Sequence, residues 1–432
     1  MNLAIIGGGW AGVAAALEAT RAGHRVTLWE ASRNLGGRAR ALPATLPSGE
    51  PVQLDNGQHI LIGAYHACLR LMQMVGIDPG QALLRLPMTL RFADGSGIAL
   101  PRWPAPLDAA GGILAARGWS WRDRVTLLGQ TLRWRLAGFR CAPELSVAAL
   151  CQHLTPRVMA DLIEPLCVAA LNTPACESSA TVFLRVLQDS VFGPSGSSHL
   201  LLPTRDLSRL FPAAAARWLE RHGVQLRTGR RVQQISPADH GWRVEDECFD
   251  QVIVATAATD AIRLLEPALA GLPPQARAGA SRWLACTRQL QHRPIATVYA
   301  WGDGATLQAP MLALRDERSA QRQWPAQFVF DRRQLGGPPG LLAFVVSASA
   351  GAREELQQQV LQQAQEQLGL ALQPVQTVVE KRATIACTPG LHRPGRQILA
   401  GLHACADYVD GPYPSTLEGA VRNAVATVAA LD

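Results

Sequence analysis

Three glycines near the N-terminus, Gly7, Gly9 and Gly12, have the GxGxxG spacing of a loop that can hold phosphate groups. Gly7 permits a tight turn, and Gly9 lets backbone N–H groups approach a pyrophosphate because it has no side chain. Gly12 lets the following helix pack closely on a sheet. The spacing therefore predicts a binding site for a dinucleotide.

The residues on either side of this loop predict the elements that position it. Residues 2–6 form an apolar run typical of a buried parallel strand, and residues 13–22 form an alanine-rich helix. A second strand over 24–29 ends at Glu30, where a carboxylate can accept hydrogen bonds from a ribose. The partial positive charge at the start of the helix would face the phosphates. Together these features predict a Rossmann-type unit.

A second glycine-rich element, Gly36-Gly37-Arg38, follows the second strand. The two glycines allow close approach of the backbone, and an arginine suits a phosphate or the polarised edge of a flavin. This element, placed after the acidic residue, resembles the large flavoprotein family of amine oxidases and phytoene-type desaturases. The resemblance implies that the dinucleotide is FAD.

A polar loop, Asp55-Asn56-Gly57-Gln58-His59, precedes an apolar run and is placed to lie beside the flavin ring. His59 in this loop either donates a proton or orients a substrate, or it is a loop histidine bonded to the backbone. From the sequence alone both interpretations stay open.

Two later segments are expected to return to the flavin-binding sheet. Short strands are predicted between residues 224 and 254, and another over residues 398–406. Ser415 and Glu418 have the spacing of a capping box, with Ser415 as the N-cap of a helix that runs to Leu431. The positive end of this helix would face the flavin edge, and Glu418 is interpreted as a cap and not as a catalyst.

Further motifs are spread over the middle and the C-terminal part of the chain. They are Gly63-Ala64-Tyr65 after the polar loop, Leu171-Asn172-Thr173-Pro174, Phe183-Leu184-Arg185-Val186-Leu187, Leu202-Pro203, and Tyr413-Pro414-Ser415-Thr416-Leu417-Glu418-Gly419-Ala420. Together with the polar loop they resemble the hydroxysqualene dehydroxylases, FAD-dependent proteins of hopanoid synthesis, over nearly the whole chain. One departure is Ala406 before Asp407, where the wider flavoprotein family usually has glycine.

This resemblance implies an α/β fold, with a Rossmann-type FAD-binding domain and a discontinuous α+β substrate-binding domain. The FAD-binding domain would comprise residues 1–84, 206–264 and 386–432, and the substrate-binding domain residues 85–205 and 265–385. The implied FAD contacts are Gly7, Gly9, Gly12, Glu30, Gly36, Gly37, Arg38, Asn56, Val232, Asp407 and Leu417.

The activity implied by the resemblance is reductive dehydroxylation of hydroxysqualene to squalene, with a hydride from reduced FAD and loss of the hydroxyl group as water. Because hydroxide is a poor leaving group, its departure needs a proton or a strong hydrogen bond. His59 and Tyr413 are selected as catalytic residues from a set that also contains Tyr408 and Asp410.

Two alternatives stay open. An oxidative polyene desaturase or an amine oxidase would use the same cofactor, and in an amine oxidase Tyr408 and Tyr413 would form an aromatic cage and Cys405 a covalent link. The second alternative is an accessory protein that binds flavin but catalyses no reaction of its own.

A long apolar isoprenoid substrate requires an apolar cavity and access from a membrane. Residues 165–174 and 179–187 either line such a cavity or belong to the ordinary core. Tryptophan and arginine alternate over residues 102–140, which is typical of a peripheral membrane surface or, alternatively, of a domain-packing helix with solvated charges. Trp119, Trp121, Arg133 and Arg135 are expected to carry lipid binding. Other enzymes of the squalene pathway are further partners to consider.

The composition excludes several other classes of protein. The chain has 432 residues, of which 48% are hydrophobic and 17% charged, as in a folded globular protein. The net charge of +7 comes without a known nucleic-acid-binding module, so no nucleic-acid partner is expected. Nine scattered cysteines and ten histidines lack metal-site or disulfide spacing. Without a secretory signal or a spanning segment, the expected location is the cytoplasm, with peripheral attachment to the inner face of the membrane.

Overall fold

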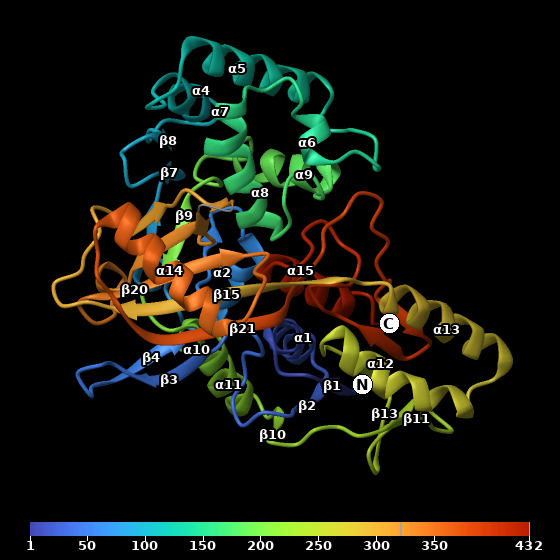
Figure 1. Ribbon diagram of the computed structural model, residues 1–432. Helices are drawn as coiled ribbons and strands as arrows, with labels where there is room; N and C mark the ends of the chain where they lie inside the picture. The colour runs from blue at the N-terminus through green and yellow to red at the C-terminus, as the bar shows by residue number, and fades with distance from the viewer. Residues whose placement is uncertain (320–321, 432) are drawn as a thin grey trace.

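Two large β-sheets and a helical layer make up the structure (Figure 1). The structure is a computed structural model and describes residues 1–319 and 322–431. Within this part of the chain, no helix combines the length and the apolar character that crossing a bilayer requires. The predicted α/β fold class is confirmed, whereas the boundaries between the two domains stay a prediction.

The first sheet has six strands in the order β10-β2-β1-β14-β23-β22. All neighbours in it are parallel except β22 and β23. Its strands are β1 (Asn2–Ile6), β2 (Arg25–Glu30), β10 (Gln225–Thr228), β14 (Gln251–Val254), β22 (Gln397–Leu399) and β23 (Leu402–Ala404). Because parallel strands share one direction, their carboxyl ends form one edge, at which the phosphate-binding loop lies.

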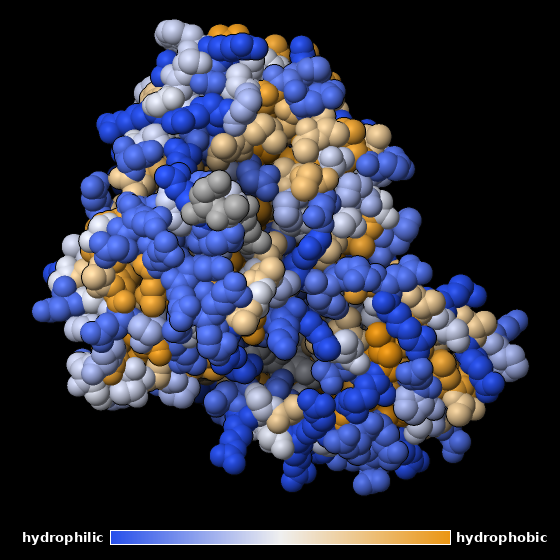
Figure 2. Space-filling view, viewed as in Figure 1, coloured by the Kyte–Doolittle hydropathy of each residue, from blue (hydrophilic) through white to orange (hydrophobic). Residues whose placement is uncertain are grey.

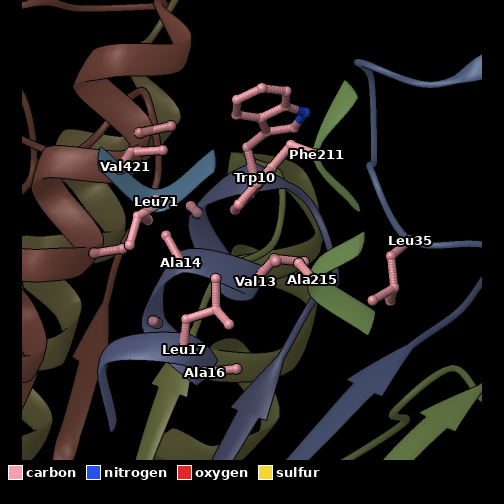
Figure 3. Close-up of a cluster of buried hydrophobic side chains, with 14 of the residues drawn as sticks. Trp10, Val13, Ala14, Ala16, Leu17, Leu35, Leu71, Phe211, Ala215 and Val421 are labelled. Atoms are coloured by element: carbon pink, nitrogen blue, oxygen red, sulfur yellow. The ribbon is translucent and has the colours of Figure 1, made fainter. Parts of the chain in front are cut away.

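Helices cover both faces of this sheet. On one face α1 (Trp10–Arg21) lies between α11 (Pro212–Arg221) and α15 (Leu417–Val428), and Figure 3 shows their apolar side chains meeting around Val13 and Leu17. The other face is covered by α12 (Ala258–Ala268) and α13 (Pro274–Arg288). The sheet is therefore buried on both sides, which explains its nearly continuous apolar strands.

The second sheet is antiparallel and has the order β16-β19-β20-β15-β21. Its strands are β15 (His292–Trp301), β16 (Met311–Ala313), β19 (Phe328–Asp331), β20 (Leu341–Ser347) and β21 (Gln373–Ile385). Helix α14 (Arg353–Leu368) packs on one face through Leu356 and Val360. The opposite face carries Phe328 and Phe330 and points toward the helical layer.

The helical layer occupies the top of Figure 1 and contains residues 107–190. Its helices are α4 (Leu107–Leu114), α5 (Trp121–Leu136), α6 (Val147–Leu150), α7 (Pro156–Val158) continuing into a π-helical turn (Met159–Ile163), α8 (Glu164–Leu171) and α9 (Ala180–Ser190). One hydrophobic cluster joins this layer to the second sheet.

Smaller elements connect these layers. They are β3 (Ala41–Thr45), β4 (Pro51–Asp55), β5 (Leu61–Ile62), α2 (His66–Met74), α3 (Pro79–Ala82), β6 (Leu83–Leu86), β7 (Thr89–Arg91), β8 (Gly97–Ala99), β9 (Leu200–Pro203), α10 (Leu207–Leu210), β11 (Ile235–Pro237), β12 (Trp242–Val244), β13 (Glu247–Phe249), β17 (Glu317–Arg318), β18 (Gln323–Trp324) and two 3₁₀ turns (Leu269–Gly271 and Arg333–Leu335).

The structure corrects three predicted element boundaries. Helix α1 begins at Trp10 and not at residue 13, because Trp10 packs against Phe211 with ring centroids 4.8 Å apart. The strand predicted over 398–406 is a hairpin of β22 and β23, which turns at Gly401 with a φ of +70°. Between 224 and 254 the structure has five short strands, β10 to β14; the strand predicted from Arg231 begins only at Ile235, as β11, and β13 was not predicted.

The capping box predicted for the C-terminal helix is wrong. The N-cap of α15 is Thr416, whose hydroxyl accepts a hydrogen bond from the backbone N–H of Gly419. Ser415 has a left-handed backbone and accepts a hydrogen bond from the N–H of Ile385. The side chain of Glu418 instead caps a different helix.

Glu418 is buried and holds the N-terminus of α2. Its two carboxylate oxygens accept hydrogen bonds from the backbone N–H groups of Ala67 and Cys68, each at 3.0 Å. These groups have no partner inside their own helix because they lie in its first turn. A negative charge is also favourable at the positive end of α2. Glu418 thus ties α15 to α2 across 350 residues of sequence.

Replacing Glu418 should destabilise the fold. In E418A two buried N–H groups lose their acceptors, so we expect the free energy of unfolding to fall by about 3 kcal/mol. E418Q keeps one acceptor oxygen and should lose less. Urea denaturation measures both values, with E220A at an exposed position of α11 as the control. Equal stability of E418A and E220A would show that the cap contributes nothing.

Candidate active site

A cavity of about 870 Å³ begins at the carboxyl edge of the six-stranded sheet and extends between the second sheet and the helical layer. Of the residues predicted to contact FAD, all except Gly12 line it. Those lining it are Gly7, Gly9, Glu30, Gly36, Gly37, Arg38, Asn56, Val232, Asp407 and Leu417. The two predicted catalytic residues, His59 and Tyr413, line it as well.

The glycine loop has the shape that its spacing predicts. Gly7 has a φ of +110°, and a Cβ atom there would lie 2.6 Å from the carbonyl oxygen of Ala255. A Cβ atom on Gly12 would lie only 1.8 Å from the carbonyl oxygen of Gly7. Gly12 therefore acts through packing, which explains why it does not line the cavity.

The N-terminus of α1 is free to receive a phosphate. Its N-cap is Gly9, so no side chain caps the first N–H groups, and no acidic residue lies in its first turn. Gly9 has a φ of −70° and lines the cavity. Uncapped N–H groups at the positive end of a helix suit a pyrophosphate. The residues present therefore fit a dinucleotide.

Glu30, at the end of β2, accepts hydrogen bonds from two backbone N–H groups. The bond from Gly8 is 2.6 Å long and that from Ser32 is 2.7 Å. These bonds fix the carboxylate at the cavity wall, where its remaining lone pairs can accept hydrogen bonds from the hydroxyl groups of a ribose. Val232 lies nearby and is buried, and its carbonyl oxygen accepts a hydrogen bond from Arg263.

The second glycine-rich element lies directly against the first. The N–H of Gly36 donates to the carbonyl oxygen of Gly8 at 2.8 Å, and a Cβ atom on Gly37 would lie 3.1 Å from the Cα atom of Gly9. Both glycines have positive φ values. The two loops can approach this closely only because neither has side chains at the contact.

Arg38 makes contacts within the protein that the sequence did not indicate. Its guanidinium donates to the Asp407 carboxylate at 2.6 Å and to the carbonyl oxygen of Ala383 at 2.5 Å. The charge of Asp407 raises the pKa of Arg38. Asn56 donates to the carbonyl oxygen of Arg38 at 3.1 Å. Three predicted contact residues thus form one network that joins distant parts of the chain at the cavity wall.

Farther from the glycine loops, the cavity wall is apolar. The segments predicted as either cavity wall or core contribute to both: Cys167, Leu171 and Leu184 are buried in the core, whereas other residues line the cavity. From α8 and α9 they are Leu166, Val168, Ala169, Ala170, Phe183, Val186 and Leu187, and the second sheet adds Ile295, Met311, Phe328, Phe330 and Val345. Such a wall can bind a long apolar molecule through the hydrophobic effect.

Asn172 explains why one of the middle motifs has its sequence. It ends α8 in a left-handed conformation with a φ of +48°. Its side-chain amide donates to the hydroxyl of Thr384 at 2.9 Å and accepts from the N–H of Ala348 at 2.7 Å. The buried Asn172 therefore holds the apolar helix α8 against the second sheet.

A polar cluster interrupts this apolar wall. The hydroxyl of Tyr413 donates to the carboxylate of Asp189 at 2.5 Å, and Nε of Arg185 donates to the same oxygen at 2.5 Å. Burial and the bond to Asp189 raise the pKa of Tyr413, which stays protonated at neutral pH. Asp189 was missed by the sequence reasoning, although its position four residues after Arg185 on a helix is the spacing of an ion pair.

His59 has a backbone partner, as one of its two interpretations expected. Its Nδ1 lies 2.8 Å from the carbonyl oxygen of Gly57, so Nδ1 carries a proton in the tautomer that satisfies this contact. Burial, and to a lesser extent the charge of Arg38, lowers the pKa of His59. A neutral ring with Nδ1 protonated leaves Nε2 as an acceptor.

The other catalytic candidates lie outside the cavity wall. Tyr408 is buried in the core beside α12, and Asp410 is exposed and pairs with Arg393. Cys405 is also buried, and burial raises the pKa of its thiol. These three residues are absent from the cavity lining, so an aromatic cage of Tyr408 and Tyr413 does not form.

The role of Gly9 can be tested without disturbing the fold. A Cβ atom there would come no closer than 3.9 Å to the protein, so G9A should fold normally. The added methyl group would occupy the path of the pyrophosphate, and we expect cofactor binding to weaken at least about tenfold. Absorbance of bound cofactor after desalting measures this, with G129A on α5 as the control. Full retention by G9A would contradict the proposed phosphate position.

Comparisons with known proteins agree with this geometry. The family model described as flavin containing amine oxidoreductase matches residues 10–431. The chain is 26% identical to hydroxysqualene dehydroxylase of Rhodopseudomonas palustris, over 97% of this chain and 95% of that protein. It is 24% identical to the protein of the same name from Sinorhizobium fredii, over 98% and 96% of the two chains.

Solved structures show the same fold. A putative protoporphyrinogen oxidase from Exiguobacterium sp. 255-15 superimposes with a TM-score of 0.68 at 19% identity, covering 100% of this chain and 98% of the other. An oxidoreductase from Methanosarcina mazei gives a TM-score of 0.72 at 17% identity and covers 99% and 100%.

Proposed function

We propose that this chain, which belongs to the family of flavin-containing amine oxidoreductases, converts hydroxysqualene to squalene by reductive dehydroxylation. Its cofactor is FAD, and it is a flavin-dependent oxidoreductase. The finer assignment of the substrate is supported by the two full-length relatives called hydroxysqualene dehydroxylase. When bound in reduced form, FAD supplies the hydride that replaces the hydroxyl group.

The observation that carries this proposal is the continuity of the cavity. One end has the uncapped helix N-terminus and the glycine loops, and the other end has the apolar wall of α8, α9 and the second sheet. A ligand on the glycine loops and a long apolar ligand can therefore lie in one continuous cavity. Exclusion of water from that space would protect a hydride transfer.

The side chains of this protein then have to help the hydroxyl group leave as water. The substrate gains a hydride and a proton and loses water, so one proton must reach the departing oxygen. Tyr413 is protonated, lines the cavity and is held by Asp189. We assign it the role of proton donor to the departing hydroxyl group. Its single O–H would turn from Asp189 to the substrate oxygen when the substrate binds, and the guanidinium of Arg422, 3.4 Å away, would stabilise the phenolate that remains. Asp189, which stays paired with Arg185, is a positioning residue, as is Arg185. The neutral His59 would accept a hydrogen bond through Nε2 and orient the substrate.

An oxidative polyene desaturase is the second candidate, because an apolar cavity beside FAD suits that reaction as well. It differs in the direction of electron flow. An amine oxidase with an aromatic cage is less well supported, since Tyr408 and Cys405 lie outside the cavity lining. An accessory protein that only binds flavin is the third candidate. It is less well supported, because such a protein would not need the polar Tyr413–Asp189 pair in an otherwise apolar cavity wall.

Direct assay separates these functions. Purified protein is reduced with dithionite under nitrogen and given hydroxysqualene, and squalene is measured by gas chromatography. We expect squalene to form in proportion to the bound FAD, and the G9A variant to form less squalene because it retains less FAD. Absence of squalene, with FAD reduction by polyenes in the oxidised protein, would instead support a desaturase.

Tyr413 variants test the assignment of the proton donor. Y413F removes the hydroxyl, and we expect kcat to fall about 100-fold while KM changes little. D189N should have a smaller effect and shift the pH profile, because it alters the partner of the phenol. Y408F is the matched control, since the buried hydroxyl of Tyr408 has no hydrogen-bond partner among the described residues. Equal activity of Y413F and Y408F would overturn the assignment.

A further inference from the structure

We propose that the outer face of α4 and α5 binds the surface of an anionic lipid bilayer. The binding itself is argued from this surface alone. Its purpose, entry of an apolar substrate, rests on the proposed function.

Exposed large apolar side chains are concentrated on this face. Among the described residues they all lie between 103 and 136, apart from Met1. They are Trp103, Leu107, Leu114, Trp121, Val125, Leu132 and Leu136. Trp121 is 69% exposed and Leu136 is 80% exposed, although both are side chains that folding usually buries. A cluster of exposed apolar side chains this large on one surface indicates an interaction site.

The side chains on α5 form one stripe. Trp121, Val125, Leu132 and Leu136 have spacings of 4, 7 and 4 residues, which place them on one side of a helix. The opposite side of α5 faces the protein, where Leu127 and Trp134 are buried in the core of the helical layer. Helix α5 is therefore apolar on both its inner and its outer side, as expected for a helix between a protein core and a lipid phase.

The lipid-binding residues predicted from the sequence are corrected in part. Trp119 is buried, and its indole N–H donates to the carboxylate of Asp161 at 3.0 Å. It belongs to the core and cannot reach a membrane. Trp121, Arg133 and Arg135 are exposed, as the prediction requires.

The charges around the stripe favour an anionic partner. Residues 102–140 contain seven arginines and two acidic residues. The arginines are Arg102, Arg117, Arg122, Arg124, Arg133, Arg135 and Arg140. Both acidic residues are buried, Asp123 as the capping partner of Ser120 and Asp108 in α4. The surface thus presents positive charges without exposed carboxylates from the same segment.

This charge pattern favours lipid over a second copy of the chain. Two copies meeting through this face would bring two sets of arginines together, and like charges repel. Phosphate groups of an anionic bilayer would instead pair with the guanidinium groups while the tryptophans and leucines enter the headgroup region. In Figure 2 blue and orange residues alternate at the upper rim, where Figure 1 shows α5.

The proposed face lies on the outside of the layer that encloses the cavity. Ile113 of α4 and Leu127 of α5 belong to the same hydrophobic cluster as Met88, Leu90 and Phe328. The last three line the cavity. Docking through this face would bring the apolar end of the cavity close to the bilayer, from which an isoprenoid could enter.

Vesicle sedimentation of the full-length FAD-loaded protein tests the proposal. Vesicles of phosphatidylcholine alone are compared with vesicles that contain 30% phosphatidylglycerol, at two salt concentrations. We expect binding to the anionic vesicles that weakens with salt. The variant W121S/L132S/L136S should lose at least about tenfold in affinity. The variant R133Q/R135Q should lose about fivefold for each arginine on anionic vesicles only.

Matched controls make the outcome decisive. R217Q/R221Q changes two exposed arginines of α11 and should bind like the unaltered protein. Light scattering without lipid follows the oligomeric state. Unchanged lipid binding by the triple variant, or absence of binding by the unaltered protein, would overturn the proposal. A dimer that the triple variant converts to monomer would show that a second copy occupies this face. Squalene formation in detergent is independent of all these readouts, so a failure of lipid binding is distinguishable from a failure of the proposed activity.

Discussion

The contact between Gly12 and the carbonyl oxygen of Gly7 fixes the position of α1 against the edge of the six-stranded sheet. Even one methyl group at Gly12 would push α1 away from the sheet edge, because its carbon atom would lie 1.8 Å from that oxygen. Helix α1 in turn is the element on which α11 and α15 pack. The direction of its uncapped N-terminus, and hence the place of the phosphates, follows from this one close approach.

Two further interactions connect distant segments to that arrangement. The Arg38–Asp407 pair joins the second glycine loop to the segment after β23, and Arg38 also reaches the backbone of β21 in the second sheet. Glu418 joins α15 to α2. Glu418 accepts hydrogen bonds from N–H groups that burial would otherwise leave unsatisfied, and Arg38, whose side chain is partly exposed, pairs with the less exposed Asp407. These polar contacts specify how the apolar layers align.

The sequence was informative where a function depends on local spacing. Gly7, Gly9, Gly12 and Glu30 lie within one strand–helix–strand unit, so their positions in the chain determine their positions in space. The partner of Glu418 could not be found this way, because it lies 350 residues away and the nearby Ser415 offered a plausible local cap. The turn at Gly401 and the burial of Trp119 were missed for a related reason. Both depend on tertiary packing, which one-dimensional patterns do not contain.

The order of strands in the six-stranded sheet has a consequence for the synthesis of the protein. Strand β14 lies inside the sheet, yet its neighbour β23 comes about 150 residues later in the chain. While the intervening residues are translated, one edge of β14 stays without its partner strand. Asp407 and Leu417, which line the cavity of the complete chain, have not yet been synthesised at that stage. At synthesis rates of about 5–20 residues per second, this interval lasts on the order of ten seconds. FAD therefore meets a complete site only late in translation, and the unpaired edge is exposed to association with other chains until then.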